Sequence, residues 1–221
     1  MVKWCSLFLL IALPCFVYGQ VGVNAKYLFG KSDILSDGFW NQDGPHVSVE
    51  YNFRLKEKRL EFRPGVGYRA TGKGNTRDGH ISGIDLDLGT AIYPFDFGGD
   101  CDCPTFSKDG NLVKKGFFLE AIPGASYQTL TRTALESGDP SRLPIRSKNM
   151  VFKLGGAVGL DIGVSDMLTI TPLFTMTWLS ASEWEGLNED GSEGKLDDQR
   201  YFGPGLRVTY NSDDKNRRRR N

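Results

Sequence analysis

The chain has 221 residues, in which 27 Lys and Arg are balanced by 27 Asp and Glu. A chain without net positive charge lacks the basic surface that general nucleic-acid binding needs, so no nucleic-acid partner is expected. Its 27 glycines, its 12% of aromatic residues and the absence of a long amphipathic helical pattern favour an all-β fold in one domain of ordinary size.

The N-terminal segment has the features of a secretory signal peptide. Lys3 precedes an apolar run at residues 7–13, and Val17-Tyr18-Gly19 places small residues where a signal peptidase cuts. Pro14 interrupts the run well short of the roughly 20 residues that a membrane-spanning helix requires. We therefore predict that residues 1–19 are a cleaved signal peptide and that the exported chain begins at Gln20. Without Lys3, 26 basic residues face 27 acidic ones.

Apolar and polar residues alternate with a period of two in eight successive segments, which is typical of β-strands. In residues 46–55, HVSVEYNFRL, every second residue is apolar. The segments are 21–29, 46–55, 60–69, 84–92, 117–128, 152–163, 168–178 and 202–210. Most have the length of about 9–11 residues with which a tilted strand crosses a bilayer.

The connections alternate in length. Those at 56–58 and 164–167 are tight, whereas those at 31–45, 72–79, 133–149 and 183–199 are longer and polar. Outer-membrane barrels have short periplasmic turns and long outer loops, so this asymmetry favours an up-and-down barrel. One link, residues 96–116, is long on the side where the others are short.

The polar faces of the segments carry charges of both signs together with many glycines. In the narrow interior of an eight-stranded barrel, large charged side chains need small neighbours, and opposite charges can pair. The apolar faces carry aromatic residues near the expected membrane boundaries, at Tyr68, Tyr127, Trp178 and Tyr210. We therefore expect the apolar faces to meet lipid and the charges to form a lumen network. Its predicted members are Lys26, Glu50, Arg54, Glu61, Arg63, Arg69, Asp85, Asp87, Glu120, Lys153, Asp161 and Arg207.

The signal peptide, the eight segments and the stretch from Ile92-Tyr93-Pro94-Phe95-Asp96 to Phe117 resemble the PorT/OmpA-like outer-membrane β-barrel proteins of Gram-negative bacteria. The resemblance covers nearly the whole exported chain and implies an outer-membrane location and a small closed barrel over residues 20–211. Such barrels often end on an aromatic residue. Here Tyr210-Asn211 is followed by residues 212–221, a basic tail that we expect in the periplasm.

Cys101 and Cys103 lie in the long link, and an exported chain meets an oxidising compartment. A local disulfide is the preferred interpretation, while two thiolates without a third ligand make an incomplete metal site. The link is expected either to cap the inner mouth of the barrel or to dock a periplasmic component. A tolerated surface insertion is the other interpretation.

Nothing in the sequence predicts catalytic, cofactor-binding or metal-binding residues. The two histidines, His46 and His80, are placed at loop–strand junctions on the outer side, without a nucleophile motif around them. The expected function is therefore a non-enzymatic barrel with a plugged lumen that acts in envelope structure, adhesion or recognition through its loops. The alternative is a soluble secreted lipocalin-like barrel, in which the apolar faces would line a pocket for a small apolar ligand.

Overall fold

The computed structural model describes residues 20–34, 38–55, 60–72, 79–96, 116–132, 145–165, 167–184 and 194–211. The predicted signal peptide, the Cys101–Cys103 pair and the basic tail lie outside these residues. Within them, no helix is both long and apolar enough to cross a membrane.

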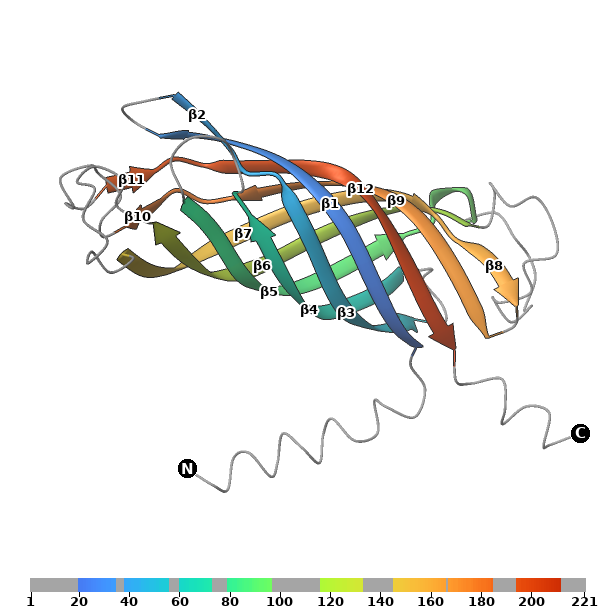
Figure 1. Cartoon of the computed structure of the whole chain (residues 1–221). Helices are drawn as coiled ribbons and strands as arrows, with labels where there is room; N and C mark the ends of the chain where they lie inside the picture. Colours follow the sequence, from blue (N-terminus) through green and yellow to red (C-terminus); the bar gives the residue numbers. More distant parts are fainter. Residues whose placement is uncertain are drawn as a thin grey trace, which may run out of the picture.

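Eight long strands form the wall of a closed barrel, and each pairs antiparallel with both neighbours (Figure 1). Their order around the barrel is that of the chain, and β1 closes the ring because it pairs with both β3 and β12. The strands are β1 (Gln20–Ile34), β3 (Gly44–Leu55), β4 (Leu60–Thr71), β5 (Gly79–Ile92), β6 (Phe117–Arg132), β7 (Ile145–Leu160), β9 (Leu168–Leu179) and β12 (Gln199–Asn211). The all-β, eight-stranded antiparallel barrel predicted from alternation is thus confirmed.

The two ends of the barrel differ. At the terminal end, where β1 begins and β12 ends, the links are residues 56–59, 93–116 and 161–167. At the distal end, the wall strands are connected by residues 35–43, 72–78, 133–144 and 180–198, each stretch being at least as long as 56–59 and 161–167. The asymmetry expected from the sequence is therefore present, and residues 93–116 are the exception that the sequence indicated. The short helix η2 (Pro94–Asp96) begins this exceptional link.

Four short strands supplement the wall, and alternation alone did not predict them as separate elements. They are β2 (Gly38–Asn41), which pairs with β1, β8 (Ile162–Ser165), which pairs with β9, and the mutually paired β10 (Ser182–Trp184) and β11 (Gly194–Leu196). Residues 183–199, expected to be a polar loop, thus contain two strand segments. Several wall strands also extend further toward the distal end than predicted, and β7 begins at Ile145 rather than near residue 152.

Candidate functional site: the filled lumen

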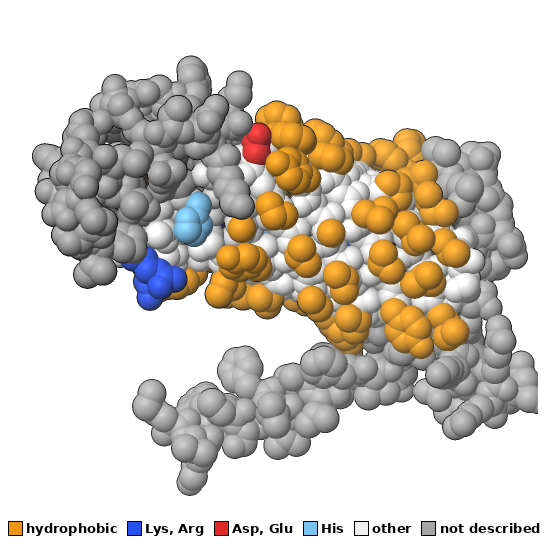
Figure 2. All heavy atoms as spheres, in the orientation of Figure 1, with side chains coloured by type: hydrophobic (Ala, Val, Ile, Leu, Met, Phe, Trp, Pro, Cys, Tyr) orange, Lys and Arg blue, Asp and Glu red, His pale blue; other side chains and the backbone are white. Residues whose placement is uncertain are grey.

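Along the middle of the wall strands, most apolar residues face outward and most polar residues face the lumen. On β5, Leu86 is 54% exposed while its neighbour Asp85 is 2% exposed. The space-filling view shows hydrophobic side chains around the middle of the barrel, with the few visible charges toward one end (Figure 2). This arrangement contradicts the lipocalin-like alternative, which requires the apolar residues to line the interior.

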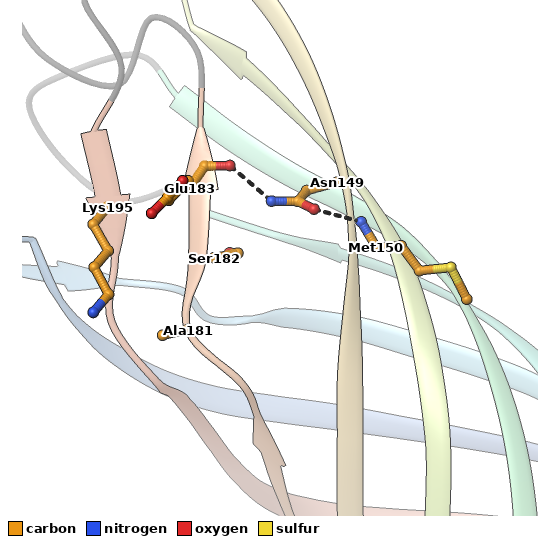
Figure 3. A pocket seen from close by; sticks show the side chains of 6 residues that line it. All are labelled: Asn149, Met150, Ala181, Ser182, Glu183 and Lys195. Atoms are coloured by element: carbon orange, nitrogen blue, oxygen red, sulfur yellow. Dashed lines mark hydrogen bonds between the residues drawn. The ribbon is translucent and has the colours of Figure 1, made fainter.

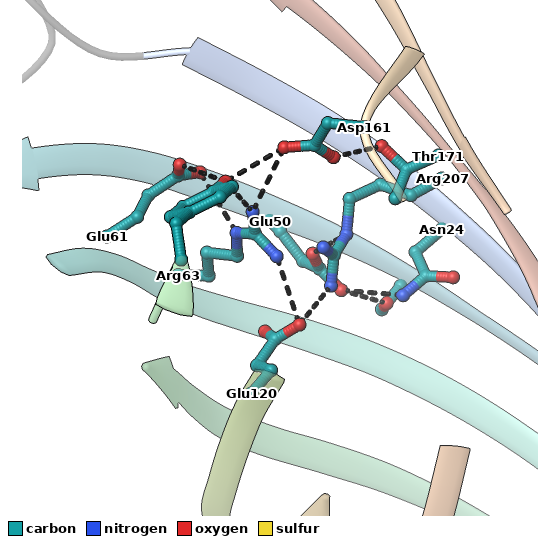
Figure 4. Close-up of polar contacts among 10 residues, drawn as sticks. Asn24, Glu50, Glu61, Arg63, Glu120, Asp161, Thr171 and Arg207 are labelled. Atoms are coloured by element: carbon teal, nitrogen blue, oxygen red, sulfur yellow. Dashed lines mark hydrogen bonds and ion pairs between the residues drawn. The ribbon is translucent and has the colours of Figure 1, made fainter. Parts of the chain in front are cut away.

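A terminal cluster of ion pairs fills the lumen toward the terminal end (Figure 4). Glu120 lies between two arginines: its Oε2 accepts hydrogen bonds from Arg63 Nη1 at 3.0 Å and from Arg207 Nη2 at 2.9 Å. Arg207 Nε is 2.7 Å from Oε2 of Glu50, whose Oε1 accepts a bond from Asn24 Nδ2 at 3.0 Å. These residues come from several strands around the wall, so the cluster connects opposite parts of it.

Tyr93 attaches the beginning of the exceptional link to this cluster. Its hydroxyl accepts a hydrogen bond from Arg63 Nη2 at 2.9 Å and lies 2.9 Å from Glu61 Oε2 and 2.8 Å from Asp161 Oδ2. Arg63 Cζ also lies 4.6 Å from the centre of the Phe118 ring, a cation–π arrangement. Tyr93 and Phe118 are buried, so aromatic rings and ion pairs together close the terminal end.

A second, central cluster is organised by Asp85. Its carboxylate accepts bonds from Lys153 Nζ at 2.9 Å and from Ser126 Oγ at 2.6 Å. Lys153 Nζ also binds Asp87 at 2.9 Å, while Arg69 Nη2 is 3.9 Å from Asp85 Oδ1. Every one of these charges therefore has an opposite charge nearby, as burial in a medium of low polarity requires.

The distal part of the lumen changes from charged to amide-bearing and then to apolar side chains. Tyr201 packs its ring 4.7 Å from Arg69 Cζ, and its hydroxyl contacts Gln42 and Gln199. Two clusters of buried side chains fill the distal part of the lumen. One consists of Leu28, Val151, Leu179 and Tyr201, and the other of Ile81, Leu130, Trp184 and Leu196. The short strands β10 and β11 supply Trp184 and Leu196, so they help to fill the distal end.

Glycines make room for the large lumen side chains. A Cβ atom on Gly159 would lie 2.5 Å from the Phe118 ring, and one on Gly67 would lie 2.6 Å from His46 Nε2. Contacts this short force the neighbour to move. These two positions bear out the reasoning that lumen glycines accompany bulky neighbours, because the interior of an eight-stranded barrel is only just wide enough for its side chains.

The structure brings most of the predicted network residues together. The residues with an opposite charge within 4 Å are Glu50, Glu61, Arg63, Arg69, Asp85, Asp87, Glu120, Lys153, Asp161 and Arg207. Lys26 also faces the lumen, but makes no such pair with a described residue. The side chain of Arg54 lies outside the described part of the structure. Tyr93, Ser126 and Thr171 also belong to the network, and because they carry no charge, the pattern of charged residues on the polar faces does not predict them.

The histidines occupy different environments. His80 is exposed near the start of β5, as predicted. His46 is the third residue of β3 and so lies near a loop–strand junction at the distal end, but its side chain points into the barrel, where it is 2% exposed and its Nε2 is 3.3 Å from Asp85 Oδ2. The strict alternation of β3 could have indicated this, since His46 shares the polar face with Glu50. Among the described residues, no group of three or more His, Cys, Asp or Glu could hold a metal ion.

A surface pocket of about 350 Å³ lies at the distal end between β7 and β10 (Figure 3). Asn149, Met150, Ala181, Ser182, Glu183 and Lys195 line it. Asn149 reaches across from β7, and its Nδ2 donates to the backbone oxygen of Glu183 at 2.7 Å. Nothing in the alternation of the sequence predicts this pocket.

No family model and no curated protein sequence matches the chain. Solved structures do match, and small outer-membrane barrels are among them. Neisserial surface protein A is 13% identical, with a TM-score of 0.48, and the match covers 86% of this chain and 96% of that one. A major outer membrane protein from Thermus thermophilus is 13% identical with a TM-score of 0.48, covering 87% and 98%. Ail, the attachment invasion locus protein of Yersinia pestis, is 12% identical with a TM-score of 0.43, covering 86% and 99%. The similarity is one of fold, at low sequence identity.

Proposed function

We propose that the chain is an outer-membrane barrel with a closed lumen, which acts without catalysis as a rigid support and presents its distal end for adhesion or recognition. The observation that carries this proposal is the filling of the lumen by paired charges and by buried apolar side chains. A pore needs a continuous aqueous path, whereas Arg63, Glu120 and Arg207 connect opposite parts of the wall across the lumen.

The outer surface supports the membrane location. Exposed apolar side chains recur along the wall strands; Val49, Val66 and Phe152, for example, are each 54% exposed. Aromatic residues occur toward both ends of this apolar belt, with Tyr68 and Tyr127 distal and Phe53 and Tyr210 terminal. An apolar band with aromatic girdles at both edges is typical of transmembrane β-barrels. The same belt on a soluble protein would be an extensive aggregation surface.

Planar-bilayer recordings of the purified barrel test the closed lumen. We expect no large, stable open-channel current. As a comparison, a double variant, Arg63→Ala with Tyr93→Ala, removes the two largest side chains that meet Glu61 and should raise the frequency of conducting events. Large stable currents from the unchanged protein would contradict the proposal.

Shortening the distal links tests the recognition role. Residues 73–78 and 133–144 can be replaced by tight turns, while the terminal link 56–59 serves as a control for altered loops in general. We expect the distal variants to insert normally and to lose attachment of expressing cells to host or abiotic surfaces. Unchanged attachment of cells that carry both distal replacements would contradict this part of the proposal.

A further inference from the structure

The wall of the barrel has a seam toward the distal end of β7. Residue pairing between β7 and β9 runs from Gly159–Leu173 to Lys153–Leu179, and one further backbone bond follows, from Ser180 N to Phe152 O at 3.0 Å. Beyond this bond, within the described residues, side chains replace part of the backbone pairing. Ser180 Oγ accepts a hydrogen bond from Phe152 N at 3.2 Å.

Further along both edges, Asn149 performs the same role. Its Oδ1 accepts a bond from Met150 N at 2.7 Å while its Nδ2 donates to Glu183 O. Alternate residues of a strand point their backbone N–H and C=O groups to the same side. The backbone groups of Lys148 and Met150 therefore face the seam, as those of Phe152 do. The surface pocket opens here, between a strand edge and β10.

The seam lies at the distal border of the apolar belt. Met150 is 68% exposed, Phe152 54% and Met176, on the neighbouring strand, 65%. On the distal side of the apolar belt the neighbouring residues are polar, and Lys148, Arg146 and Lys195 are exposed. Hydrocarbon cannot satisfy backbone donors and acceptors, so irregular backbone at this depth must meet protein, water or a polar group. A hydroxyl-rich headgroup supplies such groups while its acyl chains cover the methionines.

We infer that the seam pocket binds the phosphorylated sugar headgroup of a glycolipid from the outer face of the membrane. Hydroxyl groups of the sugar hydrogen-bond at Asn149 and at the exposed Glu183 carboxylate, and the acyl chains lie along Met150 and Phe152. The phosphate is attracted by Lys148 and by Lys195, which lies opposite Glu183 in the β10–β11 pair. The volume of the pocket falls in the range of small-molecule sites. The inference rests on the proposed membrane location.

Native mass spectrometry of the purified barrel with lipid A, a phosphorylated glucosamine disaccharide that carries acyl chains, tests this inference. Ala181→Trp fills the pocket, and Ala121→Trp places the same side chain on the outward face of β6, away from the seam. We expect the Ala181 variant to weaken lipid A binding about tenfold, while the Ala121 variant binds as the unchanged protein does. Equal binding by the Ala181 variant, or equal loss in both variants, would overturn the site.

Two further comparisons identify the ligand chemistry. Lipid A should bind more tightly than its dephosphorylated form, and Lys148→Gln with Lys195→Gln should remove that difference. Phosphatidylethanolamine should bind less tightly than either form, and equal binding would overturn the glycolipid assignment.

Flotation of the chain with lipid vesicles separates failure of this inference from failure of the proposed function. A chain that floats but does not bind lipid A at the seam overturns the inference alone. A chain that does not float overturns the membrane location, and the seam site with it.

Discussion

Glu120 shows how one lumen residue can connect several strands. Its side chain is 2% exposed, and one of its oxygens accepts hydrogen bonds from both Arg63 and Arg207. Removing one partner of a buried ion pair leaves an uncompensated charge, which costs more than the pair itself contributes. At this position the removal would leave two guanidinium groups with fewer partners.

We therefore expect Glu120→Ala to lower the free energy of unfolding by about 3–5 kcal/mol. Glu183→Ala, at an exposed position, should change it by less than about 0.5 kcal/mol. Reversible urea unfolding in lipid vesicles, followed by tryptophan fluorescence, measures both. Equal stability of the two variants would show that the lumen network adds little.

Tyr93 offers a finer test, because a single oxygen atom distinguishes tyrosine from phenylalanine. Tyr93→Phe keeps the ring, whose centre is 5.9 Å from that of Phe118, and removes the hydroxyl that meets Arg63, Glu61 and Asp161. Leaving buried polar groups without a partner costs about 1–3 kcal/mol each, so we expect a loss of at least that size in the same unfolding assay. A neutral outcome would mean that water replaces the hydroxyl.

At the scale of a strand, β5 separates a membrane barrel from a soluble one. Leu86 is near its middle and His80 near its distal end, and both side chains point outward. In a bilayer, arginine at the midplane costs about 2–4 kcal/mol and falls to about 0–1 near the interface. Leu86→Arg should therefore strongly reduce the folding yield in lipid, whereas His80→Arg should not. On a soluble barrel both changes would be nearly neutral, so equal yields would contradict the membrane location.

The strands were predictable from sequence, because a sheet with one apolar and one polar face needs strict alternation, and eight segments show it. The short elements were not. Strands β10 and β11 have three residues each, too few for a period to appear, and they lie in a stretch rich in acidic residues. Alternation therefore assigns the buried Trp184 and Leu196 to a loop.

The candidate site was predictable as a set of residues but not as a set of pairs. Alternation places Arg63 and Glu120 on the polar face of their strands. Their contact joins positions 57 apart in the chain and depends on the width and stagger of the closed barrel. Tyr93 was missed for another reason: it follows the end of β5, where alternation no longer indicates a side.

At the scale of the whole molecule, the barrel depends on the pairing of its first and last strands. β12 occupies the space between β9 and β1 along most of its length. Deleting residues 199–211 would expose the edges of both neighbours and remove Arg207 from the terminal cluster. We expect this variant to give no heat-modifiable, protease-resistant form in lipid, whereas deletion of residues 212–221 should leave that form intact. A protease-resistant barrel from the first deletion would show that seven strands close on their own.

The pairing of β1 with β12 also sets the order of events during folding. Gln20 lies opposite Asn211, so the contact that completes the ring joins the two ends of the described chain. Contacts between residues this far apart form slowly, because the entropy of closing the loop is lost before the contact stabilises anything. The wall can be completed only after the last strand has been synthesised, and until then the apolar faces need protection from water. The surface that needs protection during folding is therefore that of an unfinished sheet rather than that of a finished barrel.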